Sequence, residues 1–206
     1  MRFFFRLLYH PFAFAYDLVA ATVSFGKWND WVLGVIPFIS GTRILELGHG
    51  SGHLQRFLLD RGMFPVAIDE SPQMGRLAKR RSGTSRKLSR ALAQHLPFAE
   101  KSFDTIVATF PTDYIFNAQT LSEVKRCLSD GGRLIVLPVA FPKNSLLKWL
   151  YKVTGESPSS LTESIRSEIK RPFIDAEFIT AIETVEVKSS TLLIVIATSS
   201  PKGKDE

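Results

Sequence analysis

The chain has 206 residues, 45% of them hydrophobic, and a formal net charge of +6. This length and hydrophobic content are enough for one sizeable core, so we expect a single folded domain. The lone cysteine, Cys127, excludes an internal disulfide and is expected to be a buried, unreactive thiol. No Cys, His and Asp residues have the spacing of metal ligands, so we expect no metal ion.

The first 40 residues are rich in aromatic side chains. Asp17, Lys27 and Asp30 interrupt the apolar stretches, and none reaches the roughly 18 residues that a bilayer-spanning helix requires. Pro11 suits the first turn of a helix, and apolar residues recur behind it at spacings of three and four. This pattern favours retained helical structure over a cleaved signal peptide, although basic residues near the start flank an apolar run.

A second, short helix is expected from Asn29 to near Pro37. We therefore treat residues 1–40 as a helical segment that precedes the main domain. An alternative role for its Phe3–Phe5 end is peripheral contact with a membrane surface.

The most informative stretch is a predicted strand at 43–47, a loop with glycines at 48, 50 and 52, and a helix at 53–61. Such glycines let the backbone approach a ligand closely and adopt positive φ angles. The free N–H groups at the start of a helix favour a carboxylate or phosphate there. A dinucleotide fingerprint needs glycine where His53 stands, and a P-loop needs Gly-Lys-Ser/Thr, so both are excluded.

Residues 64–68 predict a second strand, and residues 71–81 predict the helix that follows it. Ser71 would cap this helix, and Pro72 would occupy its first turn. This second unit repeats the strand–loop–helix order of the first, which is typical of a parallel sheet.

Residues 76–90 hold seven basic side chains and no acidic one: Arg76, Lys79, Arg80, Arg81, Arg86, Lys87 and Arg90. A basic cluster can attract nucleic acid or an anionic membrane surface. The favoured interpretation is a solvated helix end and loop leading to a weak strand near 87–92. No aromatic residues are interleaved with the cluster to stack bases.

The remaining elements also alternate. They are a strand at 104–109, a helix at 117–129 stopped by Gly131-Gly132, a strand at 133–138, helical segments near 144–153 and 160–181 interrupted by Gly155, Pro158 and Pro172, and a hairpin of 183–188 with 192–197. Alternation of strands and helices predicts a parallel sheet, to which the hairpin adds one antiparallel strand. Residues 199–206 are expected to form a disordered polar tail.

Four motifs, in this order, resemble those of the class I S-adenosylmethionine-dependent methyltransferases, in particular the type 11, or quinone-biosynthesis-like, small-molecule subgroup. They are Glu46-Leu47-Gly48-His49-Gly50-Ser51-Gly52, residues 64–72 with Asp69 at the end of the strand, Leu96-Pro97-Phe98 followed by 102–107, and 123–128 followed by Asp130-Gly131-Gly132 and 133–136. The motifs cover roughly residues 43–138, and the C-terminal hairpin also fits.

The resemblance implies a Rossmann-like α/β fold: a seven-stranded, mostly parallel sheet with helices on both faces and an antiparallel last strand. Residues 41–198 would form the cofactor-binding methyltransferase domain. Helices within residues 1–40 would fold over the cofactor and help to form the acceptor pocket.

The resemblance also implies S-adenosyl-L-methionine as the cofactor and S-adenosyl-L-homocysteine as the product. The glycine loop would approach the methionine part, Glu46 would accept from the cofactor's ammonium, and Asp69 would accept from two ribose hydroxyls. Helix capping is the structural alternative for Asp69. The full implied set is Glu46, Gly48, His49 through its backbone, Gly50, Gly52, Asp69, Glu70, Met74, Ala93, Gln94, Thr109 and Phe110.

Two positions depart from the family's pattern. Leu92 stands where relatives usually carry an acid for the adenine amino group, so Gln94 or the backbone would have to accept from it. After the fourth strand, residues 109–114 read Thr-Phe-Pro-Thr-Asp-Tyr and lack the leading amide or acid of the N-P-P-Y motif. Methylation of planar amino groups therefore loses support, and Phe110 is expected to pack near the sulfonium or the acceptor.

The chemistry needs a general base only if a proton must leave the acceptor. Weak candidates are His10, Tyr16, Asp113 and Tyr114, with His53 and His95 further back, and for each a structural role is favoured. The aromatic cover segment favours a small, hydrophobic acceptor, such as a lipid or a quinone-like phenol, methylated by in-line displacement.

Three alternatives stay open at this point. The basic 76–90 segment would suit an RNA or protein methyltransferase, although we do not expect nucleic acid as a partner. A cofactor site alone would suit a non-catalytic subunit that needs a partner protein, and a dehydrogenase is disfavoured by the glycine spacing. We expect a cytoplasmic protein, with peripheral membrane contact as the alternative, and the sequence leaves the oligomeric state open.

Overall fold

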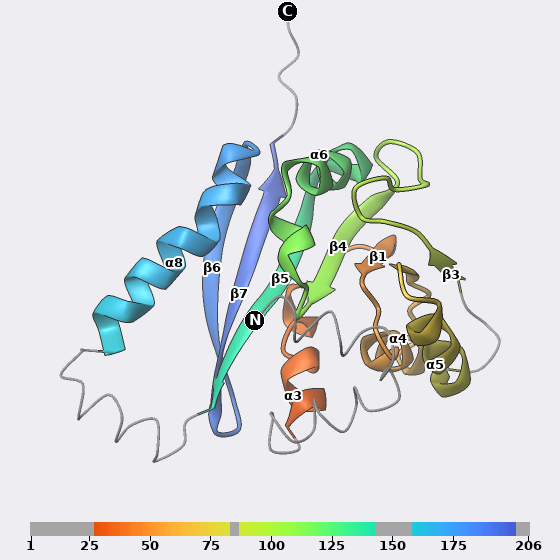
Figure 1. Cartoon of the computed structure of the whole chain (residues 1–206), viewed down its shortest axis with the longest axis horizontal. Helices are drawn as coiled ribbons and strands as arrows, with labels where there is room; N and C mark the ends of the chain where they lie inside the picture. Colours follow the sequence, from red (N-terminus) through yellow and green to blue (C-terminus); the bar gives the residue numbers. More distant parts are fainter. Residues whose placement is uncertain (1–26, 83–86, 143–157, 201–206) are drawn as a thin grey trace, which may run out of the picture.

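The structure, a computed structural model, describes residues 27–82, 87–142 and 158–200. These residues form a seven-stranded sheet with the strand order β3-β2-β1-β4-β5-β7-β6. The strands are β1 (Ile44–Leu47), β2 (Val66–Asp69), β3 (Lys87–Arg90), β4 (Phe103–Thr109), β5 (Leu128–Pro142), β6 (Phe178–Val187) and β7 (Ser190–Ser199). β7 pairs antiparallel with both β5 and β6, and its arrow points opposite to that of β4 in Figure 1. The predicted mostly parallel sheet with an antiparallel last strand is confirmed.

The helices are α3 (Trp28–Leu33), α4 (His53–Asp60), α5 (Pro72–Ser82), α6 (Ala118–Cys127) and α8 (Pro158–Asp175), with short 3₁₀ turns η2 (Ile36–Phe38) and η3 (Asp113–Phe116). Two caps set helix starts. The Ser71 hydroxyl accepts from the Met74 N–H at 3.3 Å, and the Asn117 side chain accepts from the Gln119 N–H at 2.8 Å. The predicted Ser71 cap is therefore confirmed.

Alternation along the strands divides the core into two layers. Leu45 of β1 faces a cluster that includes Leu121 and Val124 of α6 and Phe173 of α8. Its neighbour Ile44 faces the other cluster, with Trp31 and Val32 of α3 and Leu54 and Leu58 of α4. Each fully buried leucine of α4 contributes roughly 1.5–3 kcal/mol, so packing holds this short helix against the sheet.

Two sequence predictions were wrong at element boundaries. The helix predicted for 117–129 ends at Cys127, because Leu128 is extended and pairs with Phe103 of β4. Gly131-Gly132 therefore lies inside β5 and does not stop the helix; Gly131, with φ 71°, lies where the β4–β5 register shifts.

The second wrong boundary lies in the predicted helical segment 160–181. The helix α8 continues through Pro172 but ends at Asp175, and β6 begins at Phe178. Hydrogen bonding to β7, which pairs Phe178 with Ser199, outweighs any helical preference of these residues. The same strand β7 includes Ser199, the first residue of the expected tail.

Several other predictions fall outside the described residues: the helix after Pro11, the segment 144–153 and the tail beyond residue 200. Cys127 is buried, and burial raises the pKa of its thiol, as expected for an unreactive cysteine. In the described part of the chain, no three His, Cys, Asp or Glu side chains gather as metal ligands would. None of the helices described combines the length and the apolar run that a membrane span needs.

Candidate cofactor site

The candidate site lies where neighbouring parallel strands end. β1 pairs with β2 on one side and with β4 on the other, so their carboxyl ends meet at one edge of the sheet. The glycine loop follows β1, Asp69 closes β2, and Phe110 follows β4. Helices α3, α4 and α5 lie toward this end, to which the β4 arrow points in Figure 1. Ligands of open α/β sheets bind at such a position.

The glycine loop adopts left-handed backbone angles that favour glycine. Gly48, Gly50 and Gly52 have φ values of 69°, 52° and 83°. A Cβ on Gly48 would lie 2.7 Å from the Tyr114 hydroxyl, so both conformation and space require glycine there. A Cβ on Gly50 would meet nothing within 4 Å, so the backbone at Gly50 borders open space that a ligand can fill.

Asp69 ties this loop to the start of α5. Its Oδ2 accepts from the Gly50 N–H at 2.9 Å, and its Oδ1 accepts from the Ser71 N–H at 2.8 Å. The Ile68 carbonyl adds bonds from the N–H groups of Gly48 and His49, at 2.9 and 3.2 Å. Asp69 therefore holds Ser71, the residue that caps α5, and the cap itself is the Ser71 hydroxyl. Each carboxylate oxygen keeps acceptor capacity for a hydroxyl, because it can accept about two hydrogen bonds.

Glu46 is buried beside a glutamine that sequence reasoning missed. Glu46 is only 1% exposed, and the Gln55 Nε2 donates a hydrogen bond to the Glu46 Oε2 at 2.7 Å. Burial raises the pKa of the Glu46 carboxyl to about 7; the Gln55 hydrogen bond opposes this rise, and the charge of Asp69 adds to it. Gln55 lies three residues before Leu58, on the buried stripe of α4, and that spacing is the signal that could have found it.

Arg81 of α5 forms hydrogen bonds to the glycine loop. Its Nη1 donates to the Ser51 carbonyl at 2.9 Å and to the Ser51 hydroxyl at 2.7 Å. Another member of the basic cluster, Arg90, donates through Nε to the Glu70 carbonyl at 2.9 Å. The cluster is thus more than the solvated face that the sequence favoured, since two of its guanidinium groups hold backbone near the site.

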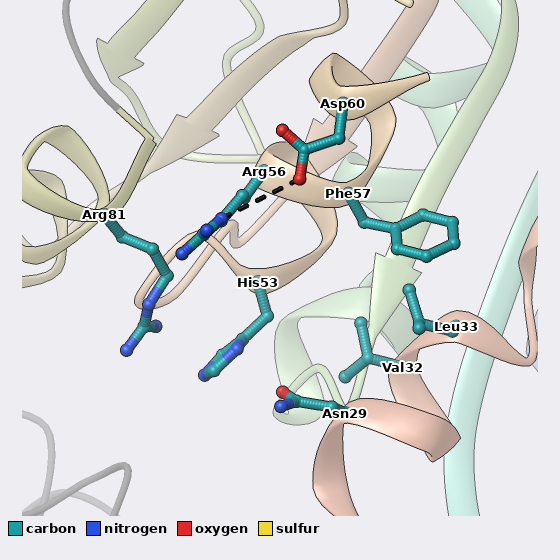
Figure 2. A pocket seen from close by; sticks show the side chains of 8 residues that line it. All are labelled: Asn29, Val32, Leu33, His53, Arg56, Phe57, Asp60 and Arg81. Carbon is teal, nitrogen blue, oxygen red and sulfur yellow. Dashed lines mark ion pairs between the residues drawn. The ribbon is translucent and has the colours of Figure 1, made fainter.

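A pocket of about 370 Å³ lies between α3, α4 and the end of α5. It is lined by Asn29, Val32, Leu33, His53, Arg56, Phe57, Asp60 and Arg81. Its α4 residues follow a helical stripe that differs from the buried one carrying Gln55. Figure 2 shows the Arg56–Asp60 ion pair along α4, with Asn29 of α3 beside His53 and Leu33 of α3 near Phe57.

The loop after β3 contains Ala93 and Gln94. Hydrogen bonds from Arg126 of α6 fix the backbone of this loop. Arg126 donates from Nη2 to the Leu96 carbonyl at 3.0 Å and from Nη1 to the Phe98 carbonyl at 2.7 Å. Ala93 is buried and Gln94 half-buried. Leu92, the position that lacks the family's acid, is 47% exposed.

Phe110 sits in a strained conformation between β4 and α3. Its φ is 48°, a left-handed value unusual for a non-glycine residue, and its N–H donates to the Leu137 carbonyl at 2.8 Å. Strain of this kind costs about 1–3 kcal/mol and gathers at functional sites. The Phe110 ring lies 4.5 Å from that of Trp28 and 6.1 Å from that of Trp31, centroid to centroid. Trp28 was not among the predicted site residues.

Residues 45–136 match a methyltransferase domain family. A demethylmenaquinone methyltransferase of Thermobifida fusca is 31% identical over 159 residues, which cover 71% of this chain and 67% of the relative. The chain belongs to the class I S-adenosylmethionine-dependent methyltransferases. Another relative of this methyltransferase, the ubiquinone/menaquinone biosynthesis C-methyltransferase UbiE of Shewanella frigidimarina, is 28% identical over 203 residues, covering 83% of this chain and 81% of the relative.

Solved structures share the fold of this methyltransferase at low identity. A SAM-dependent methyltransferase from Thermotoga maritima has a TM-score of 0.59 and 18% identity, covering 94% of this chain and all of its own. Magnesium protoporphyrin IX methyltransferase from Synechocystis, with bound S-adenosylhomocysteine, has a TM-score of 0.52 and 18% identity, covering 82% of this chain and 80% of its own. The cofactor of the methyltransferase is S-adenosyl-L-methionine.

The residues at this edge of the sheet offer the kinds of groups that this cofactor needs. The open backbone at Gly50 leaves space for a ligand, and the Asp69 oxygens have acceptor capacity for a diol. The Gln55 amide oxygen is buried without a hydrogen-bond partner, beside the Glu46 carboxyl. An ammonium group placed there would meet two oxygen acceptors.

The candidate bases of the methyltransferase lie in different surroundings. Tyr114 donates its hydroxyl to the Leu47 carbonyl at 3.1 Å and so supports the glycine loop. Asp113 is exposed at the start of η3. The His95 Nε2 lies 3.5 Å from the Gln119 Nε2, and the buried His49 ring bonds the Gly50 carbonyl through Nδ1 at 2.8 Å. His10 and Tyr16 lie outside the described residues.

Proposed function

We propose that this methyltransferase transfers a methyl group to a small, hydrophobic acceptor with a planar ring, such as a quinone-like phenol, by in-line displacement. The observation that carries the proposal is the aromatic pair of Trp28 and Phe110 at the carboxyl end of β4. Relatives named as demethylmenaquinone methyltransferases act on acceptors of this chemical kind.

The cofactor would be held by residues of three strand ends. Gly48, His49, Gly50 and Gly52 would present backbone to the methionine part, and Glu46 would accept from its ammonium. Asp69 would accept from the ribose hydroxyls while keeping its bonds to Gly50 and Ser71. The flanking set would be Glu70, Met74, Ala93, Gln94, Thr109 and Phe110. Met74 is fully buried and Glu70 exposed, so Met74 would shape the floor under the adenine and Glu70 its open side.

The bound cofactor supplies an electrophilic methyl group on a sulfonium. The chain's contribution is orientation, because holding two reactants in attack geometry is worth roughly 7–11 kcal/mol. Phe110 is held in place by its bond to Leu137 and by the Trp28 ring, so its face can lie against a planar acceptor or the sulfonium. Residues 1–40 would cover the acceptor, and a membrane contact at Phe3–Phe5 stays a prediction.

The cofactor assignment is tested by calorimetric titration of S-adenosylhomocysteine into the wild type and Asp69→Asn. Loss of the charged acceptor should weaken binding by roughly 10- to 100-fold, since hydrogen bonds to charged groups are worth about 1.5–3 kcal/mol. Asp60→Asn, an acid on the outer stripe of α4, is the matched control and should bind normally. Folded wild-type protein that takes up none of this nucleoside would end the proposal.

The acceptor is tested by transfer of a labelled methyl group to a short-chain demethylmenaquinone analogue and to short RNA. Trp28→Ala should raise the KM for the quinone analogue more than it weakens S-adenosylhomocysteine binding, because the Trp28 ring packs on the Phe110 ring, whose face is proposed to meet the acceptor. Methylation of RNA with steep salt dependence would instead favour the basic 76–90 segment as a substrate surface. Normal cofactor binding without transfer to any acceptor would favour the non-catalytic subunit.

A further inference from the structure

Glu46 and Gln55 form a buried pair whose hydrogen bonding is incomplete. Glu46 is 1% exposed and Gln55 fully buried. The Gln55 Nε2 donates to the Glu46 Oε2 at 2.7 Å, but the Gln55 Oε1 accepts from no group. A buried amide oxygen without a donor is unusual and requires an explanation.

Protonation of Glu46 would explain the unpaired Gln55 oxygen. A carboxylate can only accept, so it satisfies the amide N–H and leaves the amide oxygen empty. A neutral carboxylic acid also carries one O–H donor, which the amide oxygen can accept. Only the neutral acid can therefore give the Gln55 amide oxygen a donor before a ligand binds.

The charges around Glu46 point the same way. The charged group that acts on its carboxyl is Asp69 of β2, which is also an acid, and the α4 neighbour Gln55 is uncharged. In the loop between them, the His49 imidazole is turned to the Gly50 carbonyl. Burial beside another acid therefore disfavours the carboxylate until a cation arrives.

We propose that Glu46 is protonated in the free enzyme and receives the cofactor's ammonium, that cofactor binding expels this proton, and that Gln55 is a positioning residue that orients the Glu46 carboxyl. The proposal rests on the cofactor site of the proposed function. In the step, the Glu46 O–H bond breaks, the proton passes to solvent, and the carboxylate pairs with the ammonium. The Gln55 Nε2 keeps its hydrogen bond to the Glu46 Oε2 throughout, and the Gln55 Oε1 becomes a second acceptor for the ammonium.

The pKa of about 7 sets the pH window. Below pH 7 the free enzyme holds the proton, so binding should release close to one proton at pH 6 and about half of one at pH 7. Affinity should rise with pH up to about 8, because less proton must be displaced. The cofactor's own α-amino group titrates near 8 and contributes in the opposite sense at higher pH.

The test is calorimetry of S-adenosylhomocysteine binding at pH 6 and pH 8, in buffers that differ in ionisation enthalpy. We expect net proton release at pH 6 that shrinks strongly at pH 8. The control probe is 5′-methylthioadenosine, which has the nucleoside but no amino-acid arm, and it should release no proton. Glu46→Gln should abolish the release, whatever protons the ligand itself exchanges.

Gln55→Met keeps the length of the side chain but removes the amide. It should shift the affinity–pH curve of S-adenosylhomocysteine to higher pH, because the N–H that stabilises the carboxylate is lost. At pH 7 this means several-fold weaker binding that recovers at pH 8, with 5′-methylthioadenosine binding unchanged. Equal losses for both probes would make Gln55 merely structural and overturn the proposal.

Wild-type binding of S-adenosylhomocysteine without proton release at pH 6 would also overturn it, even if the variant failed to fold. In that case the proposed function would stand, because the nucleoside still binds. Absence of any binding by folded wild type would count against the proposed function itself.

Discussion

The ionised form of the buried Glu46 carboxyl, which would pair with the cofactor's ammonium, lowers the stability of the cofactor-free fold. Its pKa in the folded chain is about 7, raised from an ordinary 4.5, so the ionised form is worse accommodated in the fold than in the unfolded chain. The neutral form carries no such cost below pH 4.5. As pH rises from 4.5 to 7, the cost grows to roughly 3 kcal/mol, at about 1.4 kcal/mol for each pKa unit, and then stays constant.

We therefore predict that Glu46→Gln makes the cofactor-free protein more stable at pH 8. The amide needs no ionisation, so the gain should approach roughly 3 kcal/mol at pH 8 and be close to zero at pH 4.5. Thermal unfolding of both proteins across this range measures the difference. A variant that is destabilised equally at both pH values would show that ionised Glu46 has no extra cost in the folded chain.

Among the secondary-structure elements, α6 holds the loop that follows β3 through side-chain hydrogen bonds to its backbone. Arg126 and Glu123 are one turn apart on α6 and paired, Nε to Oε1 at 2.7 Å. Together they bond the backbone of residues 96 and 98, with the Leu96 N–H donating to the Glu123 Oε2 at 2.8 Å. The Arg126 guanidinium lowers the pKa of the Glu123 carboxyl, so the pair stays charged at neutral pH.

We predict that Arg126→Met loosens residues 91–98 and weakens cofactor binding by roughly 5- to 30-fold, or about 1–2 kcal/mol. Hydrogen exchange of these amides should accelerate in the same variant. Lys125→Met is the matched control: it removes a charge from the adjacent residue, whose Nζ pairs with Glu177 instead, at 2.7 Å. If both variants bind S-adenosylhomocysteine alike, the loop does not depend on Arg126.

For the molecule as a whole, the cofactor would add contacts between segments that are far apart along the chain. The glycine loop, Asp69, the loop at 93–94 and Phe110 come from four stretches of chain. A ligand that binds only the folded state stabilises it by mass action, by about 2.7 kcal/mol at 100 times its Kd.

We predict that S-adenosylhomocysteine at this concentration raises the unfolding midpoint by roughly 5–11 °C, since a chain of this size gains about 2–4 °C per kcal/mol. Reduced nicotinamide dinucleotide at equal concentration should leave it unchanged, because His53 stands in place of the fingerprint's third glycine. A shift with the dinucleotide instead would revive the dehydrogenase alternative.

The parts of the site that depend on local chain geometry could be predicted from the sequence. The glycines at 48, 50 and 52 need positive φ, the acid at 69 closes a strand, and Ser71-Pro72 starts a helix. Each of these signals lies within a few residues of the feature it specifies. The order of strands and helices likewise predicted the parallel sheet, because crossover connections leave few alternatives.

The side chains that support those parts could not be predicted, because they are brought into place by the packing of distant segments. Gln55, Arg81, Trp28 and Arg126 reach partners that are between 9 and 82 positions away along the chain, and nothing in the local pattern specifies such partners. The end of α6 was decided in the same way, because Leu128 gains a bond from β4 that a helix could not provide. Local preferences are small beside packing and ladder pairing, so contacts between distant segments set these details.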